Sequence, residues 1–177
     1  MGFFTDILAN PLFALAKEQD FRDLLTTRRF RITEEFLQGE LATLAGDEEL
    51  SGLSLKLHKG YGELAGKLQK KPIPFAIPFS ARFSLAEVQF TPESKHVRLR
   101  IDEMKPVNVD WLTERMLAKT DFMDYADGIV SCDLAKVPRL AGFFGLEVKG
   151  VRVADYLELR ELAFEKGAIT GRFGICI

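Results

Sequence analysis

Residues 75–83 of this 177-residue chain read FAIPFSARF, and the stretch decides the fold class. Apolar residues at every second position are the pattern of a strand with one face turned to a core. Prolines at positions 72, 74 and 78 place the stretch at a sheet edge or rim, because proline cannot donate a ladder hydrogen bond. Past Leu85 the apolar residues change phase, through Ala86, Val88 and Phe90, as a β-bulge would produce.

The alternation continues on both sides of this stretch. Leu53–Leu57 and Leu64–Leu68 flank a glycine-containing turn, and Val97–Ile101 alternates apolar residues with outward Arg98 and Arg100. Three further strands are expected, at 146–153, 157–164 and 168–177, punctuated by Gly150 and Gly167. The pattern therefore predicts an antiparallel meander.

Helical spacing occurs elsewhere in the chain. It predicts helices over 3–27, 33–45 and 108–119, and a short helix over 133–143. Thr33 can cap the helix over 33–45, and Gly46 ends it. We expect an α+β fold, a curled antiparallel meander wrapped around or packed on long apolar helices. Residues 1–30 form an N-terminal helical extension in this prediction, and 31–177 form an α+β domain of helix-plus-meander units.

One internal similarity links two of the expected hairpins. Residues 55–60 read LKLHKG and residues 162–167 read LAFEKG, so each is a strand that ends in a Lys-Gly turn. A helix is expected before each of them. Both convergent hairpin chemistry and a duplicated helix-plus-meander unit account for the similarity.

Composition and charge exclude several classes of protein. With 47% apolar and 28% charged residues, the chain is an ordinary globular one rather than disordered or collagenous. The net charge of −2 argues against a nucleic-acid-binding protein, which needs a strongly basic face. Basic residues cluster locally against Glu63 alone, as a solvated hairpin surface or as a site for anionic headgroups or an acidic partner. They are Lys56, Lys59, Lys67, Lys70 and Lys71.

No targeting or membrane-spanning signal is expected. Residues 1–8 lack a basic region, and Asp6 interrupts their apolar run, so they do not read as a signal peptide. No apolar run reaches the roughly 18 residues of a membrane span. Cys132 and Cys176 form no metal-binding or redox spacing. We expect a reduced, cytoplasmic protein.

Motifs for catalysis are absent from the sequence. It contains no phosphate-binding glycine motif, no HExxH zinc motif and no GxSxG nucleophile motif. His58 and His96 read as surface histidines, and Cys132 as a structural thiol without a base beside it. We therefore expect no enzyme, no catalytic residue, no metal and no cofactor.

The apolar side of the predicted sheet suggests a ligand class. Its residues are almost all Phe, Leu, Ile and Val, so the interior is either a filled core or an open hydrophobic groove between sheet and helices. A groove of this composition without polar anchors suits lipid acyl chains or another apolar molecule. The expected lining is Phe36, Leu55, Leu57, Phe75, Ile77, Phe79, Phe83, Leu99, Ile101, Leu112, Met116, Phe164 and Phe173.

The N-terminal amphipathic stretch supports an alternative function. Phe3, Phe4, Ile7 and Leu8 share one helical face, and they could anchor a protein partner, a second copy of the chain or a membrane surface. The alternative is a scaffold domain that docks a partner or self-associates through this helix.

The order of elements resembles a known family. A helix over 32–45, glycine-turned strands over 53–57 and 64–68, a long strand pair, a helix over 109–118 and a closing meander over 148–173 are similar to small bacterial proteins of the tubular lipid-binding superfamily. That superfamily includes the domains of bactericidal/permeability-increasing protein. The resemblance spans roughly residues 30–175 and implies a curled sheet around a long helix with a groove for lipid tails. Many such proteins are secreted or lipid-anchored, whereas no signal peptide and no lipobox cysteine is expected in this chain.

Overall fold

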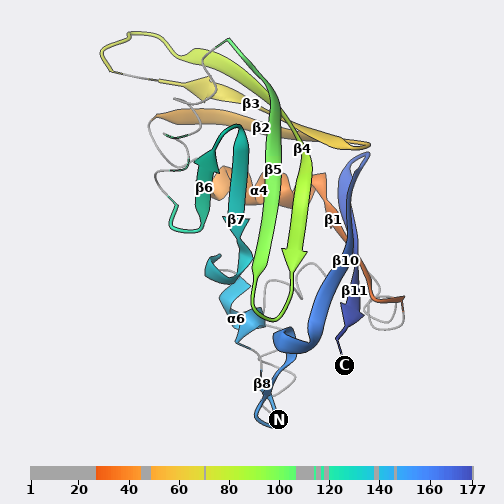
Figure 1. Cartoon of the computed structure of the whole chain (residues 1–177). Coiled ribbons are helices and arrows are strands. Elements are labelled where there is room, and N and C mark those ends of the chain that lie inside the picture. The colour runs from red at the N-terminus through yellow and green to blue at the C-terminus, as the bar shows by residue number, and fades with distance from the viewer. Residues whose placement is uncertain are drawn as a thin grey trace.

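The computed structural model describes residues 27–44, 49–69, 71–106, 114, 117, 120–137, 140–145 and 147–176. Over these residues the architecture is mostly β, with 60% strand and 17% helix, and it contains two main antiparallel sheets. Figure 1 shows the long strands β4 (Ile77–Phe90) and β5 (Lys95–Lys105) at the centre, with β2 (Leu50–His58) and β3 (Tyr61–Leu68) running across their upper part. The larger sheet is therefore strongly twisted, as sheets of L-amino acids are.

The larger sheet has six strands in the order β2-β3-β4-β5-β7-β6. The expected meander is confirmed over its first four strands, and the phase change after Leu85 is a register shift between Leu85 and Glu87. The stretch 120–130, for which the sequence predicts no strand, contributes to a hairpin. The strands are β2 (Leu50–His58), β3 (Tyr61–Leu68), β4 (Ile77–Phe90), β5 (Lys95–Lys105), β6 (Met123–Ala126) and β7 (Ile129–Asp133).

A second sheet has three strands in the order β1-β11-β10. Its strands are β1 (Arg29–Thr33), β10 (Leu157–Glu165) and β11 (Ala168–Ile175). The closing hairpin β10–β11 therefore pairs with β1, a strand near the start of the described chain, rather than extending the meander. A small hairpin, β8 (Glu147–Val148) with β9 (Val151–Arg152), precedes β10.

The predicted helix over 33–45 is confirmed as α4 (Glu34–Leu44). Thr33 caps it, since the Phe36 backbone N–H donates to Thr33 Oγ1 over 3.3 Å. The other described helices are short: α6 (Ala141–Phe144) and the 3₁₀ turns η1 (Leu134–Lys136) and η3 (Val153–Tyr156). The expected helices over 3–27 and 108–119 lie outside the described residues, apart from 27, 114 and 117.

The α+β prediction, with a meander wrapped on long apolar helices and a hydrophobic groove beside them, is wrong for the described chain. Its longest helix there is α4 with 11 residues, and α4 bonds to the edge of β2 through polar side chains. The apolar side of the six-stranded sheet packs instead against the three-stranded sheet, through Phe83 and Phe164. The apolar face of a second sheet thus covers the first sheet, where the prediction had placed long helices.

The two Lys-Gly turns noted in the sequence meet in space. The Gly60 N–H donates to the Phe164 carbonyl over 2.9 Å, and the Gly167 N–H donates to the Leu57 carbonyl over 3.0 Å. Each glycine thus bonds to the residue three before the other glycine. Both have positive φ, +86° and +75°, which glycine adopts without strain. This reciprocal contact joins the two sheets at one corner.

A small core lies at the other end of β3. Leu68 and Phe79, only 2% and 4% exposed, pack together where β3 pairs with β4. The partly buried apolar residues around them are Leu50, Leu53, Leu64 and Met104. This cluster fixes the start of the long strand β4.

Candidate functional site

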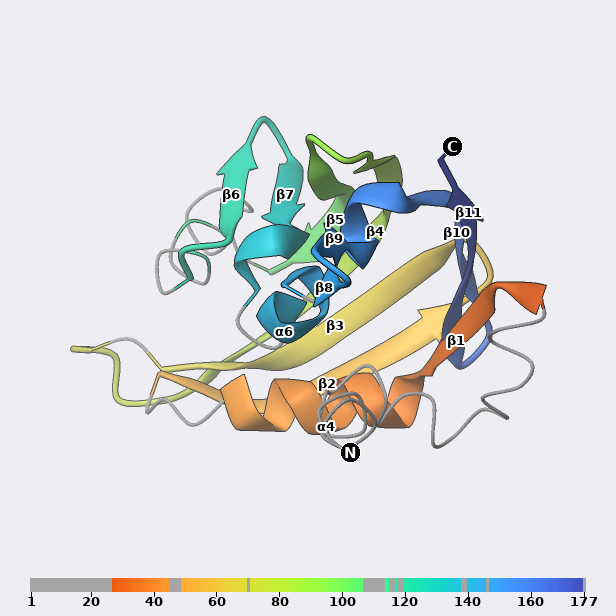
Figure 2. The same cartoon turned by 90° about the horizontal axis from the view of Figure 1, so that it is seen from below.

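The six-stranded sheet has one continuous apolar side, here called the inner face. Strand register places its residues directly opposite one another in rows that cross the sheet. Figure 2 shows this sheet curled, with α6 and the β8–β9 hairpin inside the curl. The rows are Leu64–Ala81–Met104, Phe83–Ile101, Leu85–Leu99–Val130–Tyr125 and Val88–Val97–Cys132–Met123.

The opposite side of the sheet is charged and solvated. Arg82 pairs with Glu63 over 3.3 Å, and Arg98 pairs with Glu87 over 2.6 Å. All four side chains are 41–52% exposed, so each pair contributes little to stability. The contrast identifies the inner face as the side for apolar contacts.

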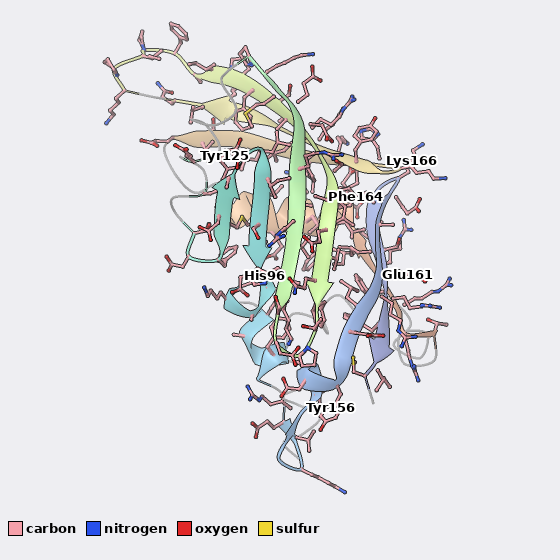
Figure 3. All side chains as sticks on the ribbon, in the orientation of Figure 1. His96, Tyr125, Tyr156, Glu161, Phe164 and Lys166 are labelled. Atoms are coloured by element: carbon pink, nitrogen blue, oxygen red, sulfur yellow. The ribbon has the colours of Figure 1, made fainter. Side chains whose placement is uncertain are left out.

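Aromatic rings from the three-stranded sheet cover part of the inner face. The rings of Phe83 and Phe164 meet edge to face with centroids 5.7 Å apart, where Figure 3 shows Phe164 between β10 and β4. Farther down, Phe173 lies 5.9 Å from Phe90 and 5.0 Å from Phe30. The edge-to-face pairs Phe83–Phe164 and Phe90–Phe173 stabilise the contact beyond their buried area. The β4 side of the inner face is thus closed by aromatic packing.

A buried lysine closes the end of the inner face. Lys95, which is 7% exposed, pairs with Phe90 across β4 and β5. Its Nζ donates to the carbonyls of Thr91 and Pro92 over 2.9 and 3.0 Å, and it lies 5.6 and 5.8 Å from the ring centroids of Phe90 and Phe144. The ammonium is therefore satisfied by the β4–β5 turn and by two aromatic faces, which indicates a structural role.

The outer edge of β2, which has no neighbouring strand in the six-stranded sheet, hydrogen-bonds to side chains of α4. Glu34 and Gln38 stand one helical turn apart, and each accepts a backbone N–H of β2 over 2.7 Å, from Leu57 and Leu55 respectively. Gln38 also donates to the Leu53 carbonyl over 2.6 Å. These bonds satisfy groups that an open sheet edge would present to another strand. They hold the inner face of β2 in place.

Replacing Glu34 by Gln is expected to lower stability at pH 7 by about 1 kcal/mol, because a charge-assisted bond becomes a neutral one. The bond from the Leu57 N–H, the largest cause, holds the pKa of Glu34 below its ordinary value of 4.5. A depressed carboxyl pKa stabilises the fold above the unfolded value, and this contribution disappears as the pH falls through the folded value.

The measurement is urea unfolding of the wild-type and Glu34→Gln proteins from pH 7 to pH 3. The difference between them should shrink below about pH 4.5. Glu35→Gln is the matched control, since Glu35 is exposed on the same helical turn. An equal loss in both variants would contradict the role of the Leu57 bond.

The titratable residues considered in the sequence are not assembled for catalysis. His58 lies 3.4 Å from Glu63, and His96 lies 3.8 Å from Asp133, all on the charged side. Cys132 lies in an inner-face row opposite Val97, so its thiol is on the other face of the sheet from the His96 ring. Burial, and then the neighbouring Asp133, raise the pKa of the Cys132 thiol to about 11. At neutral pH this thiol is protonated and a weak nucleophile.

The structure brings most of the predicted lining together. Leu55, Leu57, Phe79 and Phe164 are buried, whereas the others on the sheets are partly exposed: Ile77, Phe83, Leu99, Ile101 and Phe173. Phe36 is partly exposed on α4. Phe75 is 66% exposed in the β3–β4 connection and lines nothing. Outside the described residues, or with placement not described, are Leu112, Met116, Phe3, Phe4, Ile7 and Leu8.

Several inner-face residues were missed as candidates from the sequence. Val88 and Phe90 follow the register shift, which returns them to the side of Phe83. Following the apolar phase through the bulge would have identified them. Val130 sits in a stretch for which no strand was predicted. Phe30, which packs against Phe173 from the three-stranded sheet, lies in the short alternation of residues 29–33 (RFRIT), which was not recognised as a strand.

Comparison of the chain with family models, curated proteins and solved structures finds no match. Within the described ranges, no helix has the length and apolarity to cross a bilayer. No group of three or more His, Cys, Asp or Glu side chains in the same ranges is placed to hold a metal ion.

Proposed function

We propose that the protein binds an apolar ligand of the acyl-chain class against its inner face, without chemical conversion. The binding surface is the sheet itself and not a groove beside long helices. The resemblance of the element order to the tubular lipid-binding superfamily remains a prediction. The scaffold alternative also remains one, because Phe3, Phe4, Ile7 and Leu8 lie outside the described residues.

The observation that supports this proposal is a difference in burial along the inner face. At β2 and the start of β4, Leu57 and Phe79 are only 3% and 4% exposed. Along β5 and β7, Val97, Leu99 and Val130 are all partly exposed, although nothing charged stands among them in their rows. When an alkyl chain covers apolar side chains that were in contact with water, the free energy of the system falls.

The geometry also suits a ligand with few polar requirements. The inner-face rows that β5 shares with β7 present aliphatic side chains and the protonated Cys132 thiol. The ammonium of Lys95, at the end of β5, is already bound by the β4–β5 turn. Burying a charge without a partner would be costly, whereas an aliphatic surface accepts acyl carbons of many lengths. We therefore expect modest chain-length selectivity and contacts dominated by hydrophobic burial.

Replacing Leu99 by Gln is expected to weaken the binding of an environment-sensitive fluorescent fatty acid about tenfold. Leu99 lies between Leu85 and Val130, and a buried amide without a partner costs at least the roughly 1.4 kcal/mol that a tenfold change represents. Equilibrium titration below the micelle concentration measures the effect, with co-purified acyl species sought by native mass spectrometry.

The control is Arg98→Gln, which changes the adjacent residue on the charged side of β5. It should bind the probe like the wild type. Absence of saturable probe binding by the wild type, or equal loss in both variants, would overturn the proposed function.

A further inference from the structure

The connection between β3 and β4 carries the most exposed large apolar side chain in the described part of the chain. Phe75 is 66% exposed, against 50% for Tyr156, 45% for Val151 and 42% for Ile175. Figures 1 and 2 both show this connection projecting beyond the two sheets. We call residues 71–76 the tip. An aromatic ring at the end of a projection can enter an apolar layer before the rest of the protein reaches that layer.

Unpaired positive charge accompanies the exposed ring. Lys67, near the end of β3, and Lys71, in the tip, are both exposed. No ion pair joins either of them to a carboxylate in the described chain, whereas Lys56 and Arg82 have such partners. Two unneutralised ammonium groups close in sequence to an exposed apolar ring complement a surface that is anionic outside and apolar beneath.

The backbone of the tip is also suited to leaving water. Pro72 and Pro74 lie in the tip, and Pro78 follows at the start of β4. Proline has no backbone N–H, so these positions leave no donor that needs a partner when water is removed. This short segment therefore has few backbone N–H donors for its length.

We propose that the tip docks on an anionic lipid surface, with Phe75 entering the acyl boundary and Lys67 and Lys71 contacting the headgroups. The inference goes beyond the proposed function and does not depend on it. Because one ring and two lysines supply the contacts, docking is weak, reversible and sensitive to salt.

The test is sedimentation of the full chain with vesicles of phosphatidylcholine alone or with about one third phosphatidylglycerol, which supplies the negative surface potential. Binding is expected on the mixed vesicles and should fall at high salt. Phe75→Ala should weaken it about tenfold, from the burial of one aromatic side chain. The pair Lys67→Gln and Lys71→Gln should weaken it about fivefold per lysine.

Two matched variants test whether the tip itself is responsible. Tyr156→Ala removes another exposed aromatic residue, and Lys59→Gln with Lys166→Gln removes two exposed lysines from the opposite end of the β2–β3 hairpin, where Figure 3 labels Lys166. Both should bind like the wild type. Equal binding to neutral vesicles, no binding at all, or equal loss in tip and control variants would overturn the proposal. Monomeric fatty-acid binding is unaffected by these outcomes, so the two proposals fail separately.

Discussion

Phe79→Ala is expected to destabilise the fold by about 3–5 kcal/mol, the usual cost of emptying a buried aromatic site. Phe79 is 4% exposed and packs on Leu68, which is the largest fully buried side chain named in the described chain. The ring also lies over Gly66 of β3, where no side chain exists to fill the cavity. Urea unfolding at pH 7 measures the loss as a lower midpoint with an unchanged slope.

Phe75→Ala is the control for this change, since the same residue type four positions earlier is 66% exposed. It should alter stability by no more than about 0.5 kcal/mol. The two substitutions therefore separate the two roles of this phenylalanine-rich stretch: Phe79 supports the fold and Phe75 is available for contact. Similar losses in both variants would contradict the assignment of the core to the start of β4.

Gly171→Ala is expected to destabilise the fold by about 3 kcal/mol, at the upper end of the range for overpacking. A Cβ at this position of β11 would lie 2.2 Å from Phe30 Cζ and 2.8 Å from the Glu161 carbonyl oxygen. The carbonyl belongs to the paired strand β10, so it cannot move without disrupting the ladder. Phe30 must therefore move instead, so β1, which carries it, should separate from the three-stranded sheet first.

Gly174→Ala provides the comparison on the same strand. A Cβ there would also meet an atom at 2.2 Å, but that atom is Nε of Arg160, an exposed side chain that can turn away. The expected cost is below about 1 kcal/mol. Unfolding curves give both values, and hydrogen exchange should show faster opening of β1 for Gly171→Ala only. If the two variants were equally stable, the close approach of β1 and β11 would be wrong.

The candidate site was partly predictable because its signals are local. Alternation over Phe79–Phe83 identified which side chains share a face, and the phase change after Leu85 announced the bulge. The exposure of Phe75 was not predictable, since it continues the same alternation into the projecting connection. A periodic pattern states which residues point the same way, but it does not state where the sheet stops.

The prediction of the fold class was wrong for a different reason. The apolar face of the meander needed a covering layer, and helical spacing over 3–27 and 108–119 supplied an obvious one in sequence. In the described chain the cover is the sheet of β1, β10 and β11, whose rings reach Phe83 and Phe90. An apolar face is satisfied by any apolar partner of matching shape, so its presence does not specify whether a helix or a sheet will cover it.

By itself, the sequence determined the local elements: the capped helix α4, the alternating strands β2 to β5, and the Lys-Gly turns at Gly60 and Gly167. Tertiary structure alone decided that β1 pairs with β11, that the two turns bond to each other, and that Phe75 projects. The physical reason is that propensity, capping and alternation act between near neighbours, whereas backbone ladder bonds are chemically identical for every strand. The choice among distant partners depends on steric fits, such as that of Phe30 over Gly171, which arise only when the chain is folded.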